Sequence, residues 1–270
     1  MQDPTLLHDG EYGLFEGSSD DAVVFDSYRR DGTWSPTLVS LLTDQLLSSG
    51  GSFIDVGANI GLVSVPVAER TPTRCHAFEP EPKNCALLRR NVARHGLQQR
   101  IQVHPVALDR HTGRVQLALS PDNSGDHRLL DESHAPPGPP PDSCITVTAT
   151  TLDEALERAP LKPPIVVKID SQGAELRVLT GGRRLLPRID FLILEYWPAG
   201  LVRLGDDANE LLSLLRSQFS HGAILEQQQP PRALEPIEAM LDNLSWIPTD
   251  GSDEGFFDLL VARSPQLRTA

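Results

Sequence analysis

The stretch FIDVGANIGLVSV, residues 53–65, constrains the fold of this chain more than any other segment. An apolar run is followed by a turn containing Gly57 and Gly61, and then by residues with helical spacing. This pattern predicts a strand, a tight turn and a helix. In open α/β folds such a turn lies at the carboxyl edge of a parallel sheet, where ligands bind. Asp55, just before the turn, restricts which ligand that can be.

Short apolar runs alternate with helical patterns along much of the chain. Strands are expected at 51–56, 74–80, 101–108, 113–119, 144–152, 164–170, 191–197, 223–227 and 256–263. Helices are expected at 62–70, 83–97, 174–182 and 209–219. The alternation predicts a parallel sheet with helices on both faces, closed by an antiparallel pair at one edge.

The domain organisation follows from the same pattern. Residues 1–50 are expected to form an N-terminal cap segment, with a helix over 36–50 that leads into the first strand. Residues 51–270 are expected to form one domain. Its longest link, at about 120–143, is polar and rich in proline, and a link of that length in a compact domain is typical of a lid or a solvated spacer. We predict that its first half covers the site.

Composition excludes several classes of partner. A formal net charge of −13 over 270 residues argues against nucleic acid and against an anionic membrane surface. There is neither a secretory signal pattern nor a run of eighteen apolar residues. Three widely spaced cysteines indicate reduced thiols and a cytoplasmic setting, and the histidines show no metal-ligand spacing. The sequence gives no signal for an oligomeric state.

Asp55 indicates the chemistry of the ligand. A dinucleotide would place its pyrophosphate at the helix start, where Asp55 would repel it, so a ligand with a positive end fits better. Glu79 ends the second strand, about where an acid accepts hydrogen bonds from a ribose. A cationic amino-acid end and a ribose together describe S-adenosylmethionine. Two alternatives stay open: a turn that serves chain geometry only, and NAD binding, although the glycines miss the GxGxxG spacing.

Several segments together resemble the FkbM family of methyltransferases. They are FIDVGANIGLVSV, AFEPEPKNCALLRRNV, NSGDHRL and KIDSQGAELRVLTGG, within roughly residues 25–200, and GTWSP resembles an upstream signature of the family. The resemblance implies the class I fold that uses S-adenosylmethionine and releases S-adenosylhomocysteine, with a Rossmann-like, mostly parallel seven-stranded sheet and an antiparallel edge strand. The chain departs from the family pattern at Ser171 and Gln172, where valine and glutamate are frequent, and at Ser35, where glutamate is common.

The residues expected at the site lie at strand ends and in the loops above them. The expected cofactor-binding residues are Asp55, Gly57, Ala58, Asn59, Gly61, Glu79, Pro80, Ala107 and Asp170. For catalysis we expect Asp170, Glu195 and His127, because a hydroxyl needs a base or a metal ion to become a good nucleophile. Asp170 could instead cap a helix, Glu195 could be an ordinary strand-end acid and His127 a solvated loop residue. Lys168 is expected to pair with an acid or to extend to the rim.

The resulting functional prediction is O-methylation of a hydroxyl on a sugar, glycan or small natural product. One alternative is a protein that binds S-adenosylmethionine without turnover, and another is a methyltransferase for a carboxylate or nitrogen acceptor. A nicotinamide oxidoreductase is disfavoured by Asp55. A dedicated metal site is not expected, although Asp170 and Glu195 together could hold a divalent ion.

Overall fold

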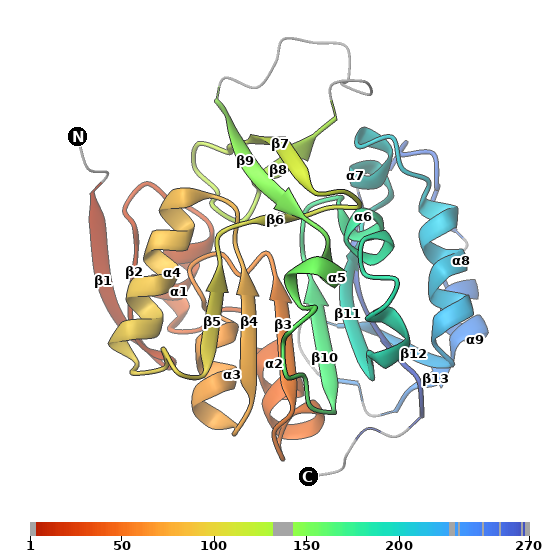
Figure 1. The fold of residues 1–270 in the computed structure, drawn as a ribbon, viewed down its shortest axis with the longest axis horizontal. Helices are drawn as coiled ribbons and strands as arrows, with labels where there is room; N and C mark the ends of the chain where they lie inside the picture. The colour runs from red at the N-terminus through yellow and green to blue at the C-terminus, as the bar shows by residue number, and fades with distance from the viewer. Residues whose placement is uncertain are drawn as a thin grey trace.

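The structure, a computed structural model, describes residues 4–131, 143–226, 230–231, 233–244, 246–253, 255–265 and 267 (Figure 1). Its main sheet has the strand order β13-β12-β14-β11-β10-β3-β4-β5. These strands are β3 (Ser52–Val56), β4 (Arg74–Phe78), β5 (Ile101–His104), β10 (Ile165–Ile169), β11 (Phe191–Tyr196), β12 (His221–Leu225), β13 (Glu235–Pro236) and β14 (Phe257–Ala262).

The pairing in this sheet is mostly parallel. The strands from β5 to β11 pair in parallel, whereas β14 is antiparallel to both β11 and β12. The expected antiparallel pair therefore exists, but its antiparallel member lies inside the sheet and not at the rim. The two-residue β13 is the outermost strand on that side. The other strands of this sheet are the seven that we expected.

Two apolar cores cover the two faces of the main sheet. Neighbouring residues of β3 belong to different cores, Phe53 to one and Ile54 to the other, because successive side chains of a strand point to opposite faces. The first core includes residues of α1 (Val24–Asp31), α2 (Pro36–Ser40), the π-helix η1 (Leu41–Leu46), α3 (Ser64–Arg70) and α4 (Pro82–Arg94). The second includes residues of α5 (Leu152–Ala155), α6 (Glu175–Thr180), η2 (Leu186–Arg188), α7 (Pro198–Arg203), α8 (Ala208–Gln218) and α9 (Ile237–Asp242).

A second, four-stranded sheet lies over the carboxyl ends of the main strands (Figure 1). It contains β6 (Ala107–Leu108), β7 (Gly113–Ala118), β8 (Arg128–Leu130) and β9 (Cys144–Thr150). The prediction of one continuous strand at 101–108 is therefore wrong. β5 ends at His104 and the chain moves to the second sheet at β6, because Pro105 has no N–H to donate to a ladder.

The predicted lid segment is partly structured. Within 120–143, β8 pairs with β7, while residues 132–142 lie outside the described residues. In the described part, 120–131, β8 is the edge strand of the second sheet. Its role as a lid stays a prediction.

The first fifty residues contain more structure than the single helix expected at 36–50. β1 (Thr5–Gly10) and β2 (Gly13–Ser18) form an antiparallel hairpin, called here the N-terminal hairpin, which lies against α4 (Figure 1). α1 follows it, and the expected helix is α2 continued by η1, which ends at Leu46. Among the described residues, no helix is long and apolar enough to cross a membrane.

Candidate functional site

The turn after β3, residues 57–61, is called loop 57–61. Gly57 has φ 76° and Gly61 has φ 95°, which are left-handed values that glycine adopts without strain. A Cβ at Gly57 would lie 1.9 Å from the carbonyl oxygen of Asp170, so no other residue fits there. Asn59 has φ 50°, which confirms that it takes a left-handed conformation here. The loop is therefore closely packed against the end of β10.

Glu79 fastens loop 57–61 to the end of β4. Its side chain is buried, with one carboxylate oxygen accepting the N–H of Asn59 at 2.8 Å and the other the N–H of Glu81 at 2.9 Å. Burial raises the pKa of Glu79 to about 8, although these two hydrogen bonds favour the charged form. Each oxygen keeps a further lone pair for a ligand.

Lys168 lies between two carboxylates. Its Nζ is 3.4 Å from Oδ1 of Asp55 and 3.5 Å from Oδ2 of Asp170, which confirms the expected pairing with an acid. Burial by itself would lower the pKa of Lys168, but the charges of Asp170 and Asp55 outweigh it and raise that pKa. Asp55 is fully buried and its Oδ2 accepts from the hydroxyl of Ser64 at 2.5 Å. Its Oδ1 has no hydrogen bond, only the ion pair.

Gln172 connects the two acids that we expected to be catalytic. Its amide nitrogen donates to Oδ1 of Asp170 at 2.9 Å and to Oε2 of Glu195 at 3.2 Å. The backbone of Gln172 is left-handed, with φ 55°. Hydrogen bonds to the side chain of Glu175 stabilise this turn. Oε1 of Glu175 accepts from the N–H and hydroxyl of Ser171, both at 3.0 Å. A buried glutamate thus shapes the turn that presents Asp170 and Gln172.

Asp170 and Glu195 differ in their surroundings. The Asp170 side chain is 44% exposed and keeps its ion pair with Lys168. Glu195 is buried, and burial together with the charge of Asp170 raises the pKa of Glu195 to about 9. At neutral pH Glu195 therefore carries a proton. Two acids with such different environments are suited to different roles in proton transfer.

His127 lies in the described part of the predicted lid. Its Nδ1 accepts the N–H of Ser120 at 3.1 Å, and burial lowers its pKa, so the neutral ring carries its proton on Nε2. The ring then offers a donor where we expected a base. Nearby, the hydroxyl of Ser124 donates to Asp21 at 2.5 Å and contacts the side chain of Asn59, so this segment is fixed to both loop 57–61 and the start of α1.

Two hollows meet at these residues. The inner cavity, about 900 Å³ including its mouth, extends from loop 57–61 to the second sheet. The outer groove, about 2020 Å³, extends from α1 and the segment after it to the ends of β11, β12 and β14. The residues that line both hollows are Val24, Trp34, Gly125, Asp170 and Gln172. A ligand in one hollow would therefore face a ligand in the other across Asp170 and Gln172.

A family model for the methyltransferase FkbM domain matches residues 55–224. This range covers more than half of the chain and includes every residue expected at the site. The chain belongs to the FkbM methyltransferase family. The match confirms the resemblance noted above, and with the sheet order it confirms the class I fold.

Individual relatives of this FkbM protein are distant. It is 28% identical over 154 residues to the 2-O-methyltransferase NoeI of Sinorhizobium fredii, covering 53% of this chain and 62% of the relative. It is 28% identical over 162 residues to the hexuronic acid methyltransferase AglP of Haloferax volcanii, covering 60% of this chain and 59% of the relative. The chain thus spans about three fifths of these two relatives. A crystal structure of methyltransferase FkbM from Methylobacillus flagellatus superposes with a TM-score of 0.47 at 18% identity, covering 82% of this chain and 47% of that one.

The expected site residues of the FkbM protein gather as the sequence suggested. The inner cavity is lined by Asp55, Gly57, Ala58, Asn59, Glu79, Pro80, Ala107, Asp170 and His127. Gly61 does not line it, and its neighbours Ile60 and Leu62 do. Glu195 lines the outer groove only. Their roles stay predictions.

Two features of the site were missed from the sequence. The apolar wall of the inner cavity comes from the second sheet and the segment before it: Val106, Leu108, Leu117 and Leu129. Ser124 and Asp21 were not singled out, although an aspartate before an apolar helix is a recognisable capping signal. No group of three potential metal ligands occurs in the part of the chain that the structure describes.

Proposed function

We propose that this FkbM protein is an S-adenosylmethionine-dependent methyltransferase that methylates a hydroxyl group of a sugar, glycan or small natural product. The observation that carries the proposal is the meeting of the inner cavity and the outer groove at Asp170 and Gln172. Methyl transfer is an in-line displacement, so donor and acceptor must lie on opposite sides of one point. Two hollows that share one wall satisfy this requirement.

The inner cavity fits S-adenosylmethionine. Glu79, with a lone pair left on each oxygen, would accept hydrogen bonds from the ribose hydroxyls. The apolar wall of the second sheet would cover the adenine. Oδ1 of Asp55 is buried at the cavity, where it pairs with the ammonium of Lys168 at 3.4 Å and keeps a lone pair for a donor of the ligand. When bound, S-adenosylmethionine supplies a methyl group activated by a sulfonium.

The acid–base step falls to Asp170. Its carboxylate is partly exposed at the junction, so it can accept the proton of the acceptor hydroxyl while the hydroxyl oxygen forms its new bond to carbon. Glu195, protonated at neutral pH, is a hydrogen-bond donor and not a second base. Gln172 holds both carboxyl groups with one amide nitrogen and keeps them at a fixed separation. Lys168 balances the charge of Asp170 between turnovers.

The lining of the outer groove favours an acceptor without negative charge. Among the described residues its ionisable side chains are Asp31, Asp126, Arg128, Asp170, Glu195, Glu226 and Asp258, of which Glu195 is protonated at neutral pH. Arg128, the one basic side chain of this set, already pairs with Asp126 at 2.5 Å. A carboxylate would meet repulsion there, so a neutral hydroxyl-bearing ring is favoured over a uronic acid. The relative NoeI is a 2-O-methyltransferase, which agrees with an oxygen acceptor.

The experiment is methyl transfer from S-adenosylmethionine carrying a ¹³C-methyl group to three matched glycosides: a methyl glucoside, a methyl glucosaminide and a methyl glucuronide. We expect O-methylated product from a neutral or amino ring, detected by mass spectrometry, and the lowest rate with the glucuronide. Binding of S-adenosylhomocysteine without transfer to any of a broad set of hydroxyl compounds would favour a protein that binds the cofactor without turnover. Preference for the glucuronide would contradict the argument from charge.

We also propose a cytoplasmic location. Cys75 and Cys85 are buried thiols that form no disulfide, which fits a reducing compartment. Fractionation of cells that express the protein tests this. Recovery with the membrane or secreted fraction would contradict it.

A further inference from the structure

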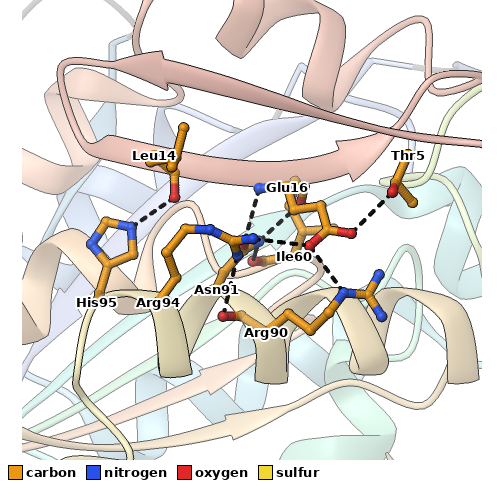
Figure 2. Close-up of polar contacts among 8 residues, drawn as sticks. All are labelled: Thr5, Leu14, Glu16, Ile60, Arg90, Asn91, Arg94 and His95. Atoms are coloured by element: carbon orange, nitrogen blue, oxygen red, sulfur yellow. Dashed lines mark hydrogen bonds and ion pairs between the residues drawn. The ribbon is translucent and has the colours of Figure 1, made fainter.

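We infer that Asn91 is a positioning residue that couples the N-terminal hairpin to loop 57–61, so that a segment outside the matched family range helps to hold the cofactor. This inference rests on the proposed function for the identity of the ligand. Asn91 lies on α4, and its side chain is fully buried. Figure 2 shows it between the hairpin above and Ile60 behind.

The amide of Asn91 makes three hydrogen bonds, all to backbone groups. Its Oδ1 accepts the N–H of Glu16 at 2.8 Å, and its Nδ2 donates to the carbonyl oxygen of Glu16 at 3.0 Å. These two bonds engage β2 as a neighbouring strand would. The remaining hydrogen of Nδ2 goes to the carbonyl oxygen of Ile60 at 2.9 Å, inside loop 57–61. One side chain therefore joins a hairpin, a helix and the loop.

The loop end of this connection is part of the inner cavity. Ile60 lines the cavity, its N–H donates to the side chain of Asn59 at 2.7 Å, and the N–H of Asn59 in turn reaches Glu79. Beside it, α4 packs so closely that a Cβ at Gly61 would lie 2.7 Å from Leu88. A shift of Ile60 would therefore alter both the cavity wall and the donor that Glu79 accepts.

The hairpin end is fixed by a charged cluster. The side chain of Glu16 accepts from Thr5 at 3.0 Å, from Arg90 at 3.1 Å and from Arg94 at 3.2 Å (Figure 2). Burial alone would raise the pKa of Glu16, but these hydrogen bonds lower it. The ring of His95 also lies 3.1 Å from the carbonyl oxygen of Leu14. β2 is thus held at Leu14 and Glu16 to α4 and to the residue that follows it, with the fully buried amide among these contacts.

Asn91→Asp tests the inference because it keeps the size and the acceptor for Glu16 N–H but removes both donations. A carboxylate oxygen would then face two carbonyl oxygens. We expect the dissociation constant of S-adenosylhomocysteine, measured by calorimetry, to rise at least about tenfold. The KM for S-adenosylmethionine should rise with it, while kcat at saturating cofactor changes less than about twofold.

Thr71→Val is the matched control for a loss of buried hydrogen bonds. Thr71 is buried just before β4, at the amino ends of the parallel strands and so away from the carboxyl ends that carry the site. Its hydroxyl donates to the carbonyl oxygen of Val67 at 2.7 Å. This variant should lose stability without a change in cofactor affinity. Where Asn91→Asp does not fold, hydrogen exchange on the wild type decides instead. Addition of S-adenosylhomocysteine should then slow exchange in residues 13–18 as well as in residues 57–61.

Different results would contradict the proposed function and the coupling through Asn91. If the wild type does not bind S-adenosylhomocysteine, the proposed function is wrong. If the wild type binds it, but Asn91→Asp binds it equally well or residues 13–18 show no added protection, the coupling through Asn91 is wrong and the proposed function stands.

Discussion

The inner cavity and the outer groove are built in opposite ways, although they share a wall. The polar groups around loop 57–61 are short-range and buried: Asn59 bonds Glu79, which bonds Glu81, all within 25 residues. The outer groove takes its lining from distant segments, α1 and residues 33–38 at one end of the chain and Phe256 and Asp258 at the other. The contacts between loop 57–61 and Glu79 are therefore encoded locally, whereas the lining of the outer groove depends on the assembled fold. Variants in the inner cavity should therefore change the affinity for the cofactor, and variants in the outer groove should change the KM for the acceptor.

The largest effect is expected at the shared wall. Asp170→Asn keeps the shape and most hydrogen bonds but removes the carboxylate that takes the proton. We expect turnover to fall about 10²-fold or more, with S-adenosylhomocysteine binding nearly unchanged. Single-turnover transfer and calorimetry on the same sample test this. Near-normal turnover would make Asp170 structural and would contradict its role as the base.

A change within the inner cavity should act on the cofactor alone. In Glu79→Gln the amide cannot accept all the hydrogen bonds that the carboxylate accepts from Asn59, Glu81 and a ribose. We expect the dissociation constant of S-adenosylhomocysteine to rise about tenfold or more, because the amide of glutamine would leave a buried N–H without its acceptor. When the cofactor is saturating, the KM for the acceptor should not change. Glu157→Gln, an exposed glutamate, is the control, and equal affinity in both variants would remove Glu79 from the cofactor site.

The acids at the junction predict a pH dependence of stability. Glu195 has a pKa of about 9 in the folded protein against an ordinary value of 4.5, so the folded state keeps a proton that the unfolded state releases. Its contribution is fully present below pH 4.5 and is lost as the pH rises toward 9. Relative to Glu195→Gln, the wild type should lose at least about 1.4 kcal/mol of unfolding free energy between pH 5 and 9. Urea unfolding at both pH values measures this, and parallel curves would show that Glu195 is ionised in the fold.

The smallest effect is expected in the outer groove. Asp258 lies opposite Glu195 in the pairing of β14 with β11, and Asp258→Asn removes one of the exposed acids. For an acceptor with a carboxylate, KM should fall about fivefold, the equivalent of about 1 kcal/mol between charges at 4 Å in water. For a neutral acceptor it should hardly change. Steady-state kinetics with the matched glucoside and glucuronide decides, and a change in cofactor affinity would break the separation between the two hollows.

The part of the site that could be predicted from the sequence is the part that is local. Asp55, loop 57–61 and Glu79 lie on one strand–turn–helix–strand unit, so residue type and spacing place them directly. Asp170 and Glu195 were found because each ends an apolar strand, and parallel strands end at the same edge of a sheet. Lys168 was expected to pair with an acid for the same reason.

The remainder depends on contacts between distant segments. At Pro105 the chain leaves the main sheet and enters the second sheet, which supplies one wall of the inner cavity. Hydrophobic periodicity alone predicted these segments as separate strands and did not show that they form a sheet of their own. The N-terminal hairpin was missed because Leu6, Leu7 and Leu14 are exposed on it, so it lacks the alternation of a half-buried strand. The role of Asn91 could not be predicted, since its three partners lie 31 and 75 residues away. An asparagine within an apolar helical stripe was the only sign.

The central claim is that the inner cavity holds S-adenosylmethionine, and calorimetric titration of the wild type with S-adenosylhomocysteine tests it most directly. We predict binding at one site per chain, with competition by S-adenosylmethionine and none by NADH. At a concentration one hundred times the dissociation constant, the ligand should stabilise the fold by about 2.7 kcal/mol. Stabilisation by NADH with no heat from S-adenosylhomocysteine would contradict the account.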